Sequence, residues 1–169
     1  ITETKNTNLK RSVGAAEVST NPIYPYQKRA FYIEESYPMP WMYPYLTPHG
    51  LILKLNNQPT QITKELISND TAFWQWYTQR LTSDSRFIRD IVARKSFSKL
   101  RTAIASLYNA RGFIKEAEAA YRQSIELYDL SPEANFRLAT LLANNNRFDE
   151  AINIIDTLQV KDPKNSQLK

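Results

Sequence analysis

The stretch Ile104–Ala117, IASLYNARGFIKEA, recurs 34 residues later as Leu138–Ala151, LATLLANNNRFDEA. The same offset pairs Tyr121 with Ile155. Self-similarity at a fixed period of this length is typical of helical repeat arrays, in which each repeat is one supersecondary unit. The sequence therefore predicts a helical hairpin that is written twice.

Small residues and turn residues stand at equivalent positions of the two copies. Alanines in the middle of the helices let the two helices of a hairpin approach closely. The four alanines are Ala105, Ala117, Ala139 and Ala151. Gly112 and Asn146 follow the first helix of each copy, where the chain needs a left-handed conformation that Gly and Asn tolerate best. Pro132 suits the first position of a helix, which needs no amide hydrogen, and Pro163 stops the last helix.

Residues 98–165 resemble two tetratricopeptide repeats, because repeat length, small residues and turn residues agree together. The tryptophan that is frequent early in the first helix of this family is replaced by Arg101 and Asn135, and Asp129 stands at the first repeat's terminal proline position. The resemblance implies a protein-interaction scaffold that binds a protein or peptide partner in a groove lined by the first helix of each repeat.

Carried onto this chain, the groove positions lie at regular spacing along the two first helices. They are Lys99, Thr102, Ser106, Asn109, Ala110, Glu133, Phe136, Thr140, Ala143 and Asn144. They lack the basic and amide combination with which some tetratricopeptide domains clamp a C-terminal carboxylate, so we do not expect that ligand. About three repeats are needed to bury a continuous core. The alternative is therefore that two repeats merely cap a larger fold, with helices in 70–95 completing the stack.

The expected fold is mainly α, with tetratricopeptide-like hairpins preceded by a small β element and a loop rich in proline and aromatic residues. We expect a loosely ordered arm over 1–21, with one short helix around Leu9–Val18, and the β element over 22–59. Linking helices follow over 60–97, and the two repeats occupy 98–169.

Proline controls the region before the helices, since six of the nine prolines fall between Pro22 and Pro48. Proline interrupts helices and pushes the preceding residue toward extended geometry. The runs Phe31–Glu35 and Leu51–Leu55 are rich in residues that favour strands. We therefore predict two strands joined by a proline-stiffened loop.

Two aspartates are candidate helix caps in the region between the strands and the repeats. Asp70 precedes an aromatic stripe that contains Trp74 and Trp76, and Asp84 precedes the next apolar set. Ile88 and Phe97 are nine residues apart, which is half a turn out of phase at roughly 100° per residue. Either the helix breaks near residues 95–96, or one long helix shows opposite faces to different neighbours.

The composition argues against an enzyme. The chain of 169 residues contains no Cys and a single His, which excludes thiolate chemistry, Cys-based metal sites and paired-His metal sites. It has no glycine-rich phosphate loop and no assembled nucleophile arrangement. We therefore predict no catalytic residue, no metal and no cofactor in this segment.

The net charge of +5 comes mostly from residues 86–101, which we interpret as a solvated helix face. No nucleic-acid module accompanies it, so we expect no nucleic-acid partner. No stretch reaches the 18 to 20 apolar residues that cross a bilayer, so we expect no transmembrane segment in this piece. Because it starts with Ile1, we interpret it as a segment of a longer protein.

Eight aromatic rings lie among the prolines, and three explanations stay open for them. The rings pack on the Trp74/Trp76 stripe as a core between elements, they offer a platform to a sugar or peptide, or they rest at a membrane interface. The candidate ligand surface comprises Tyr32, Trp41, Tyr43 and His49.

Residues 28–36, KRAFYIEES, and 45–55, YLTPHGLILKL, are similar to the soluble C-terminal tail of certain bacterial polytopic membrane proteins. Those proteins resemble glycosyltransferases of the protein O-mannosyltransferase class and often end in tetratricopeptide-like helices. The resemblance, which covers 22–56, implies an extracytoplasmic, periplasmic tail that contacts the membrane portion of its own parent chain. It also implies that the catalytic carboxylates belong to that membrane portion.

The function expected from the sequence is thus a non-catalytic protein-interaction scaffold. The alternative is an accessory carbohydrate-binding domain that uses the aromatic residues.

Overall fold

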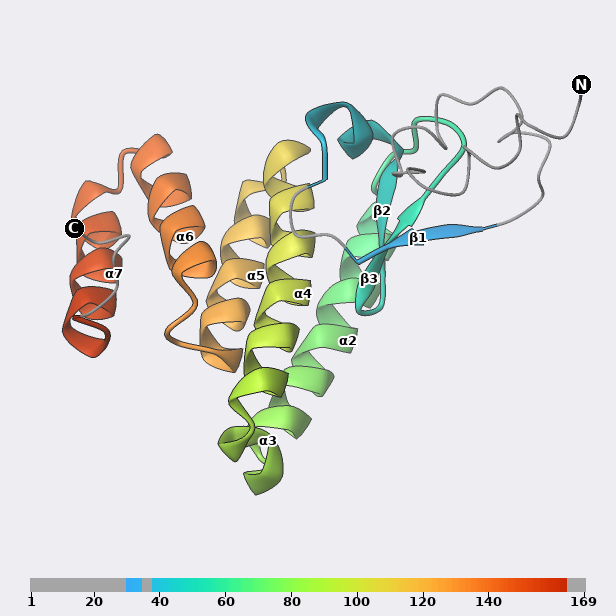
Figure 1. Cartoon of the computed structure of the whole chain (residues 1–169). Helices are drawn as coiled ribbons and strands as arrows, with labels where there is room; N and C mark the ends of the chain where they lie inside the picture. Colours follow the sequence, from blue (N-terminus) through green and yellow to red (C-terminus); the bar gives the residue numbers. More distant parts are fainter. Residues whose placement is uncertain (1–29, 35–37, 164–169) are drawn as a thin grey trace, which may run out of the picture.

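The computed structural model describes residues 30–34 and 38–163 (Figure 1). The expected arm over 1–21, with its helix around Leu9–Val18, lies outside the described residues. The described chain is mainly helical with one small sheet, which confirms the expected fold class.

The sheet has three antiparallel strands in the order β1-β3-β2. They are β1 (Phe31–Ile33), β2 (Leu46–His49) and β3 (Ile52–Leu55). β1 and β3 fall inside the two predicted runs, whereas β2 was not expected because it contains Pro48. Proline is tolerated there because β2 is an edge strand that, within the part of the chain that the structure describes, pairs only with β3. Gly50, with φ +61°, turns the chain between β2 and β3.

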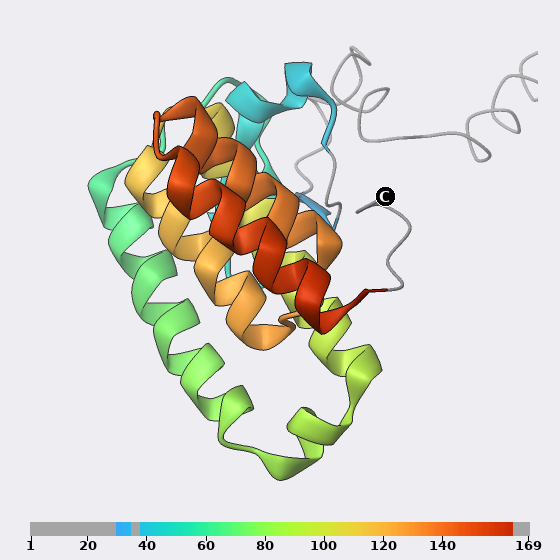
Figure 2. The same cartoon turned by 90° about the vertical axis from the view of Figure 1, so that its left-hand side faces the viewer.

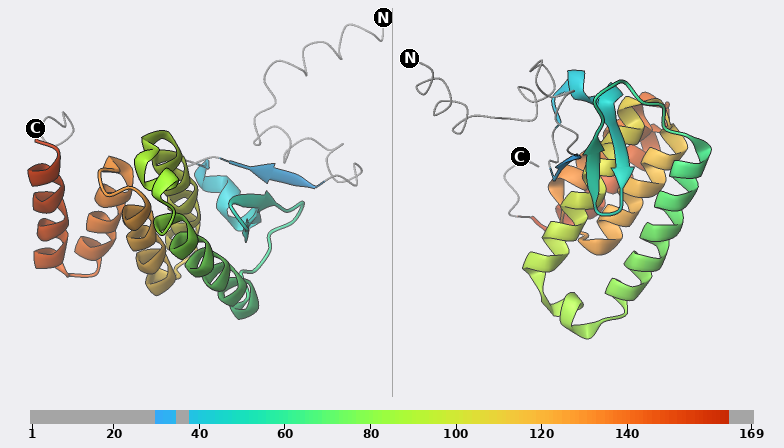
Figure 3. Two further views of the ribbon diagram at one scale, coloured as in Figure 1. Left: turned by 90° about the horizontal axis from the view of Figure 1, so that it is seen from below. Right: turned by 90° about the vertical axis from the view of Figure 1, so that its right-hand side faces the viewer.

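The loop between β1 and β2 contains a 3-10 helix, η2 (Pro40–Tyr45). Between residues 56 and 163, six α-helices follow the sheet. They are α2 (Lys64–Thr82), α3 (Ser85–Arg89), α4 (Ile91–Ala110), α5 (Ile114–Leu127), α6 (Pro132–Asn144) and α7 (Phe148–Lys161). The helices form a row with α7 at one end, and the strands lie on the opposite side of α4, as the views in Figures 2 and 3 show.

The helix ends follow local signals, with one exception. Asp84 caps α3 by accepting a hydrogen bond from the Arg86 amide at 2.8 Å, as predicted. The prediction that Asp70 caps a helix is wrong, because α2 begins earlier and Thr63 caps it by accepting from the Leu66 amide. Asp70 is instead buried in the middle of α2.

The break in the helix falls at Asp90, which caps α4. No break occurs near residues 95–96, so α4 is the single long helix that presents different faces to different neighbours. Phe97, early in α4, packs against Phe87 and Tyr77, with ring centroids 5.8 and 5.6 Å apart. Further along, every residue from 101 to 108 is buried, because the strands, α2, α5 and α6 all pack around this part of α4.

The two hairpins α4–α5 and α6–α7 turn as the repeat pattern predicts. Gly112 and Asn146 have φ values of +78° and +61°, which confirms the left-handed conformation expected after each first helix. Pro132 is the first residue of α6, also as predicted, and Ser131 caps that helix.

Hydrogen bonds tie the β element to the helices. The indole Nε1 of Trp74 donates to the Gly50 carbonyl at 3.1 Å. Arg111, at the end of α4, donates to the Tyr43 carbonyl at 3.0 Å and to the Thr60 carbonyl at 2.9 Å. Strand and helix side chains also form one continuous apolar core, which includes Leu46, Leu53, Trp74, Ile104, Leu107 and Leu138. The strands and the helical row therefore form one folded body.

A charged cluster lies inside this body. Arg101 donates to Asp70 and to Gln123 at 2.8 Å each, and the Tyr108 hydroxyl donates to the same oxygen of Asp70 at 2.8 Å. The guanidinium also lies over the Trp74 ring, 5.0 Å from its centroid. These contacts join α2 to both helices of the first hairpin.

Candidate functional site

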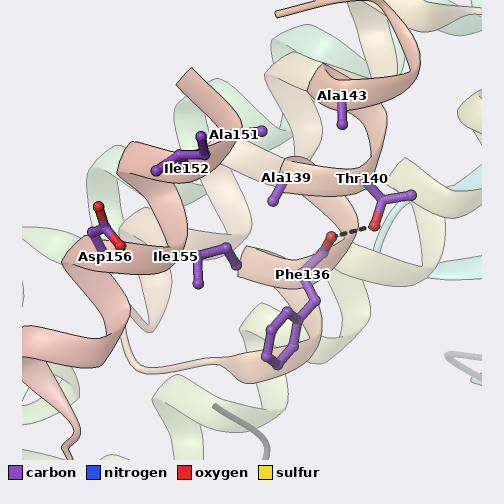
Figure 4. A pocket seen from close by; sticks show the side chains of 8 residues that line it. All are labelled: Phe136, Ala139, Thr140, Ala143, Ala151, Ile152, Ile155 and Asp156. Carbon is purple, nitrogen blue, oxygen red and sulfur yellow. Dashed lines mark hydrogen bonds between the residues drawn. The ribbon is translucent and has the colours of Figure 1, made fainter. Parts of the chain in front are cut away.

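A groove of about 520 Å³ lies between α6 and α7 (Figure 4). Its lining comes from both helices and is almost entirely apolar. The lining residues are Phe136, Ala139, Thr140, Ala143, Ala151, Ile152, Ile155 and Asp156. The Thr140 hydroxyl donates to the Phe136 carbonyl at 2.8 Å, so its polar group is satisfied within the helix. Asp156 is thus the only charged side chain in the groove.

The internal repeat gives this groove a counterpart in the first hairpin. The offset of 34 residues relates Phe136 to Thr102, Thr140 to Ser106 and Ile155 to Tyr121. The three residues of the first hairpin are buried. The corresponding residues of the second hairpin are half-buried or exposed.

Helix α6 covers the first-hairpin surface, since it packs against both α4 and α5. Tyr121 lies against α4 and near Arg137 of α6. Its hydroxyl lies 3.1 Å from that of Ser106, and burial raises its pKa, while Arg137 of α6 is among the groups that lower it. The groove between α6 and α7 therefore corresponds, in the second hairpin, to the surface of the first hairpin that α6 covers.

Salt bridges hold α7 in place and so fix one wall of the groove. Arg147, just before α7, pairs with Glu118 of α5 and with Glu150. Arg122 of α5 reaches Glu118 and Glu150 as well. The hydrogen bond with Arg147 is the main reason that the pKa of Glu118 is lowered. At the other end, Lys161 pairs with Asp129 at 3.0 Å.

The residues of the first repeat that were expected to line a groove fall into two groups, one buried and one exposed. Thr102 and Ser106 are buried under α6, so the prediction that they line an open groove is wrong. Lys99, Asn109 and Ala110 are exposed on α4 and lie outside the groove between α6 and α7.

The residues expected from the second repeat lie closer to the prediction. Phe136, Thr140 and Ala143 line the groove. Glu133 pairs with Arg137 at 3.2 Å, and Asn144 is exposed at the end of α6. The apolar side chains that α7 contributes were missed, although the 34-residue register with the first hairpin contained the signal for them.

The candidate aromatic surface is divided in a similar way. Tyr32 and His49, from the two edge strands, lie with ring centroids 4.9 Å apart, and both are exposed. Trp41 is exposed in η2, where its indole nitrogen donates to the Met39 sulfur at 3.3 Å. Tyr43 is half-buried near Arg137 and Glu133 of α6, and burial raises its pKa. The structure thus brings Tyr32 and His49 together, whereas Tyr43 lies in different surroundings.

Within residues 30–34 and 38–163, no group of three or more His, Asp or Glu side chains is placed to hold a metal ion. None of the helices in the same ranges is both long and apolar enough to cross a membrane.

Comparison with protein-family models matches residues 108–169 to the tetratricopeptide repeat. This match supports the tetratricopeptide-like reading of the two hairpins, and repeats of this kind generally mediate protein–protein interaction or scaffolding. No curated protein and no solved structure matches the chain.

Proposed function

We propose that this chain is a non-catalytic scaffold that binds a protein partner, and that the groove between α6 and α7 receives an amphipathic helix of that partner. The observation that carries the proposal is the repeat register. The same surface of the first hairpin is already covered by α6, which shows that a helix fits on it.

The lining indicates the chemistry of the partner helix. Relative to the first hairpin, Phe136 replaces Thr102, and Ile152 replaces Glu118. The groove is therefore more apolar than its counterpart and favours a helix with apolar residues at spacings of three and four. Asp156 at the rim favours a Lys or Arg on the edge of that helix.

A peptide of residues 131–146, which contains α6, is the probe that the repeat itself provides. We expect it to bind the 169-residue chain saturably, as measured by fluorescence anisotropy of a labelled peptide. Thr140→Glu places a charge in the groove at a position whose counterpart in the first hairpin, Ser106, is buried, so we expect binding weaker by about 10-fold or more. Val160→Glu is the matched control, because Val160 is an exposed residue of α7 outside the groove.

Two results would contradict this proposal. One is the absence of saturable peptide binding. The other is equal weakening by Thr140→Glu and Val160→Glu, which would show a charge effect independent of the groove.

A second candidate function is carbohydrate binding by the aromatic surface. Its support is the close pair of exposed rings, Tyr32 and His49, with exposed Trp41 in the nearby sequence. Titration with soluble glycans, followed by NMR, tests it. Shifts of the ring protons of Tyr32 or Trp41 would support this function, and unchanged ring signals would exclude it for the glycans used.

We further propose that the chain is the extracytoplasmic, periplasmic tail of a bacterial membrane protein related to glycosyltransferases, and that it contacts the membrane portion of that protein. The support is the resemblance of residues 28–36 and 45–55 to such tails. The coding sequence upstream of Ile1 tests the proposal, which requires a series of hydrophobic spans there.

A further inference from the structure

We propose that the corner formed by α3 is a contact site for the surface of an anionic lipid bilayer. In Figures 1 and 2 and in the right panel of Figure 3, α3 lies at the extreme lower end of the helical body. The long helix α2 ends just before this corner, and the long helix α4 begins just after it. It is far along the body from the end of α4 where η2 is attached.

The corner exposes three large aliphatic side chains. Ile88, Ile91 and Val92 have exposed fractions of 51%, 56% and 74%. Their neighbour Phe87 is buried against Phe97, which shows that the corner is packed on its inner side and is not a loose end. A cluster of exposed apolar residues on a folded corner is typical of an interaction surface.

Basic residues surround these aliphatic side chains. Arg86 and Arg89 lie on α3, and both are exposed. Together with Asp90, Ile91 and Val92 they line a shallow hollow of about 490 Å³. Guanidinium groups beside exposed aliphatic groups fit the phosphate of a lipid headgroup beside the start of its acyl chain.

The two acidic residues of the corner accept hydrogen bonds at the helix starts, and Asp84 also pairs with Arg86, so Arg89 is the arginine of α3 without an acidic partner among the described residues. Asp84 accepts from the Arg86 amide and from the Arg86 guanidinium, and Asp90 accepts from the Ala93 amide at 3.0 Å. The last turns of α2 add exposed Trp76, with Arg80 5.8 Å from its ring centroid. Tryptophan and arginine together are favoured at the interface between water and lipid.

The shape of the corner favours a bilayer over a protein partner. Helix α3 and the start of α4 form a projecting end of the body, and the shallow hollow there is lined by aliphatic side chains and arginines. Insertion of a few aliphatic side chains combined with attraction of basic residues to anionic lipid is the usual mode of interfacial binding. This inference is independent of the groove between α6 and α7.

Co-sedimentation of the 169-residue chain with lipid vesicles tests the proposal. One set of vesicles is phosphatidylcholine alone, and the other contains about 30% phosphatidylglycerol, which supplies a negative surface. We expect binding to the anionic vesicles that weakens as salt is raised, since screening reduces the attraction. Arg89→Gln, which removes the unpaired cation of α3, should lower the partition coefficient about fivefold.

Ile91→Ser combined with Val92→Ser should also lower the partition coefficient by about 10-fold or more, because two aliphatic side chains no longer enter the lipid. Val160→Ser, at an exposed site on α7, is the matched control and should bind as the unchanged chain does. Circular dichroism and thermal unfolding establish that each variant is folded, which we expect because the substituted side chains are exposed.

Three results would overturn the proposal. The first is the absence of binding to anionic vesicles. The second is binding that the Ile91→Ser/Val92→Ser variant retains in full. The third is a dimer in sedimentation velocity that the same variant converts to a monomer, since the corner would then be an interface between two copies of the chain.

Discussion

Arg101 and Asp70 form an ion pair in the interior, with Nη1 2.8 Å from Oδ2 and neither side chain more than 3% exposed. The pair joins α2 to the first helix of the first hairpin. Gln123 accepts a hydrogen bond from Arg101, and Tyr108 donates one to Oδ2 of Asp70, whereas the buried Oδ1 of Asp70 has no hydrogen-bond partner among the described residues. The position of Arg101 is the one at which the resemblance leads us to expect tryptophan, so the chain has an ion pair where an apolar contact would be usual.

Asp70→Ala should destabilise the fold by about 3–5 kcal/mol, because it leaves the buried guanidinium of Arg101 without its counterion. Urea unfolding followed by circular dichroism measures the change. The double variant Asp70→Leu/Arg101→Met should recover much of the loss, because it removes both charges together. An Asp70→Ala variant as stable as the unchanged chain would contradict the role given to the pair.

Arg111→Met should loosen the β element while leaving the hairpins intact. The guanidinium donates to the carbonyls of Tyr43, in η2 before β2, and of Thr60, after β3, and charge-assisted hydrogen bonds of this kind contribute about 1.5–3 kcal/mol. Hydrogen exchange of the β2 and β3 amides should become faster, whereas exchange in α6 should stay the same. Equal acceleration in both regions would mean that Arg111 stabilises the whole fold instead.

Gly112→Ala should destabilise the first hairpin by about 1–2 kcal/mol through the backbone alone. A Cβ at this position meets no atom within 4 Å, so steric overlap with neighbours does not contribute. Asn146→Gly, at the equivalent turn, should be neutral or slightly stabilising because φ is +61° there. The midpoint of thermal unfolding should therefore fall for Gly112→Ala, whereas for Asn146→Gly it should stay the same or rise slightly.

The Glu118 to Arg147 contact should make stability depend on pH in the acidic range. The folded state holds the pKa of Glu118 below its ordinary value of 4.5, so the carboxylate stabilises the fold above that pH. The contribution is lost as pH falls below about 4.5 and through the lower folded-state pKa. Glu118→Gln should flatten this part of the stability profile, and Glu126→Gln, an exposed glutamate on the same helix, should leave it unchanged.

Local signals in the sequence predicted the parts of the fold that depend on local chemistry. Gly112, Asn146 and Pro132 marked the turns correctly because backbone conformation at those positions is restricted by the residue itself. Asp84 was identified as a cap because its partner is the amide two residues later. Strand β2 was not predicted because it contains Pro48. Proline is acceptable in a strand only at the edge of a sheet, and edge position depends on the assembled sheet.

Features that depend on distant residues could not be predicted in the same way. Asp70 resembles a cap because it precedes an aromatic stripe, but its partners are 31 and 38 residues further along the chain. Thr102 and Ser106 were assigned to a groove from positions within one helix. Their burial depends on α6 lying over them, which a pattern within one repeat does not contain.

The hydrogen bond from Trp74 to Gly50 and the shared apolar core make the two ends of the helical row different. At the α4 side, α2 and the strands occupy the flank of the first hairpin, so a hairpin inserted there would displace them. At the other end, none of the described residues covers the groove between α6 and α7. An extra hairpin designed in the same 34-residue register could therefore be added after α7 without changing the other helices. Lengthening of this molecule by repeat addition should therefore succeed at one terminus and fail at the other.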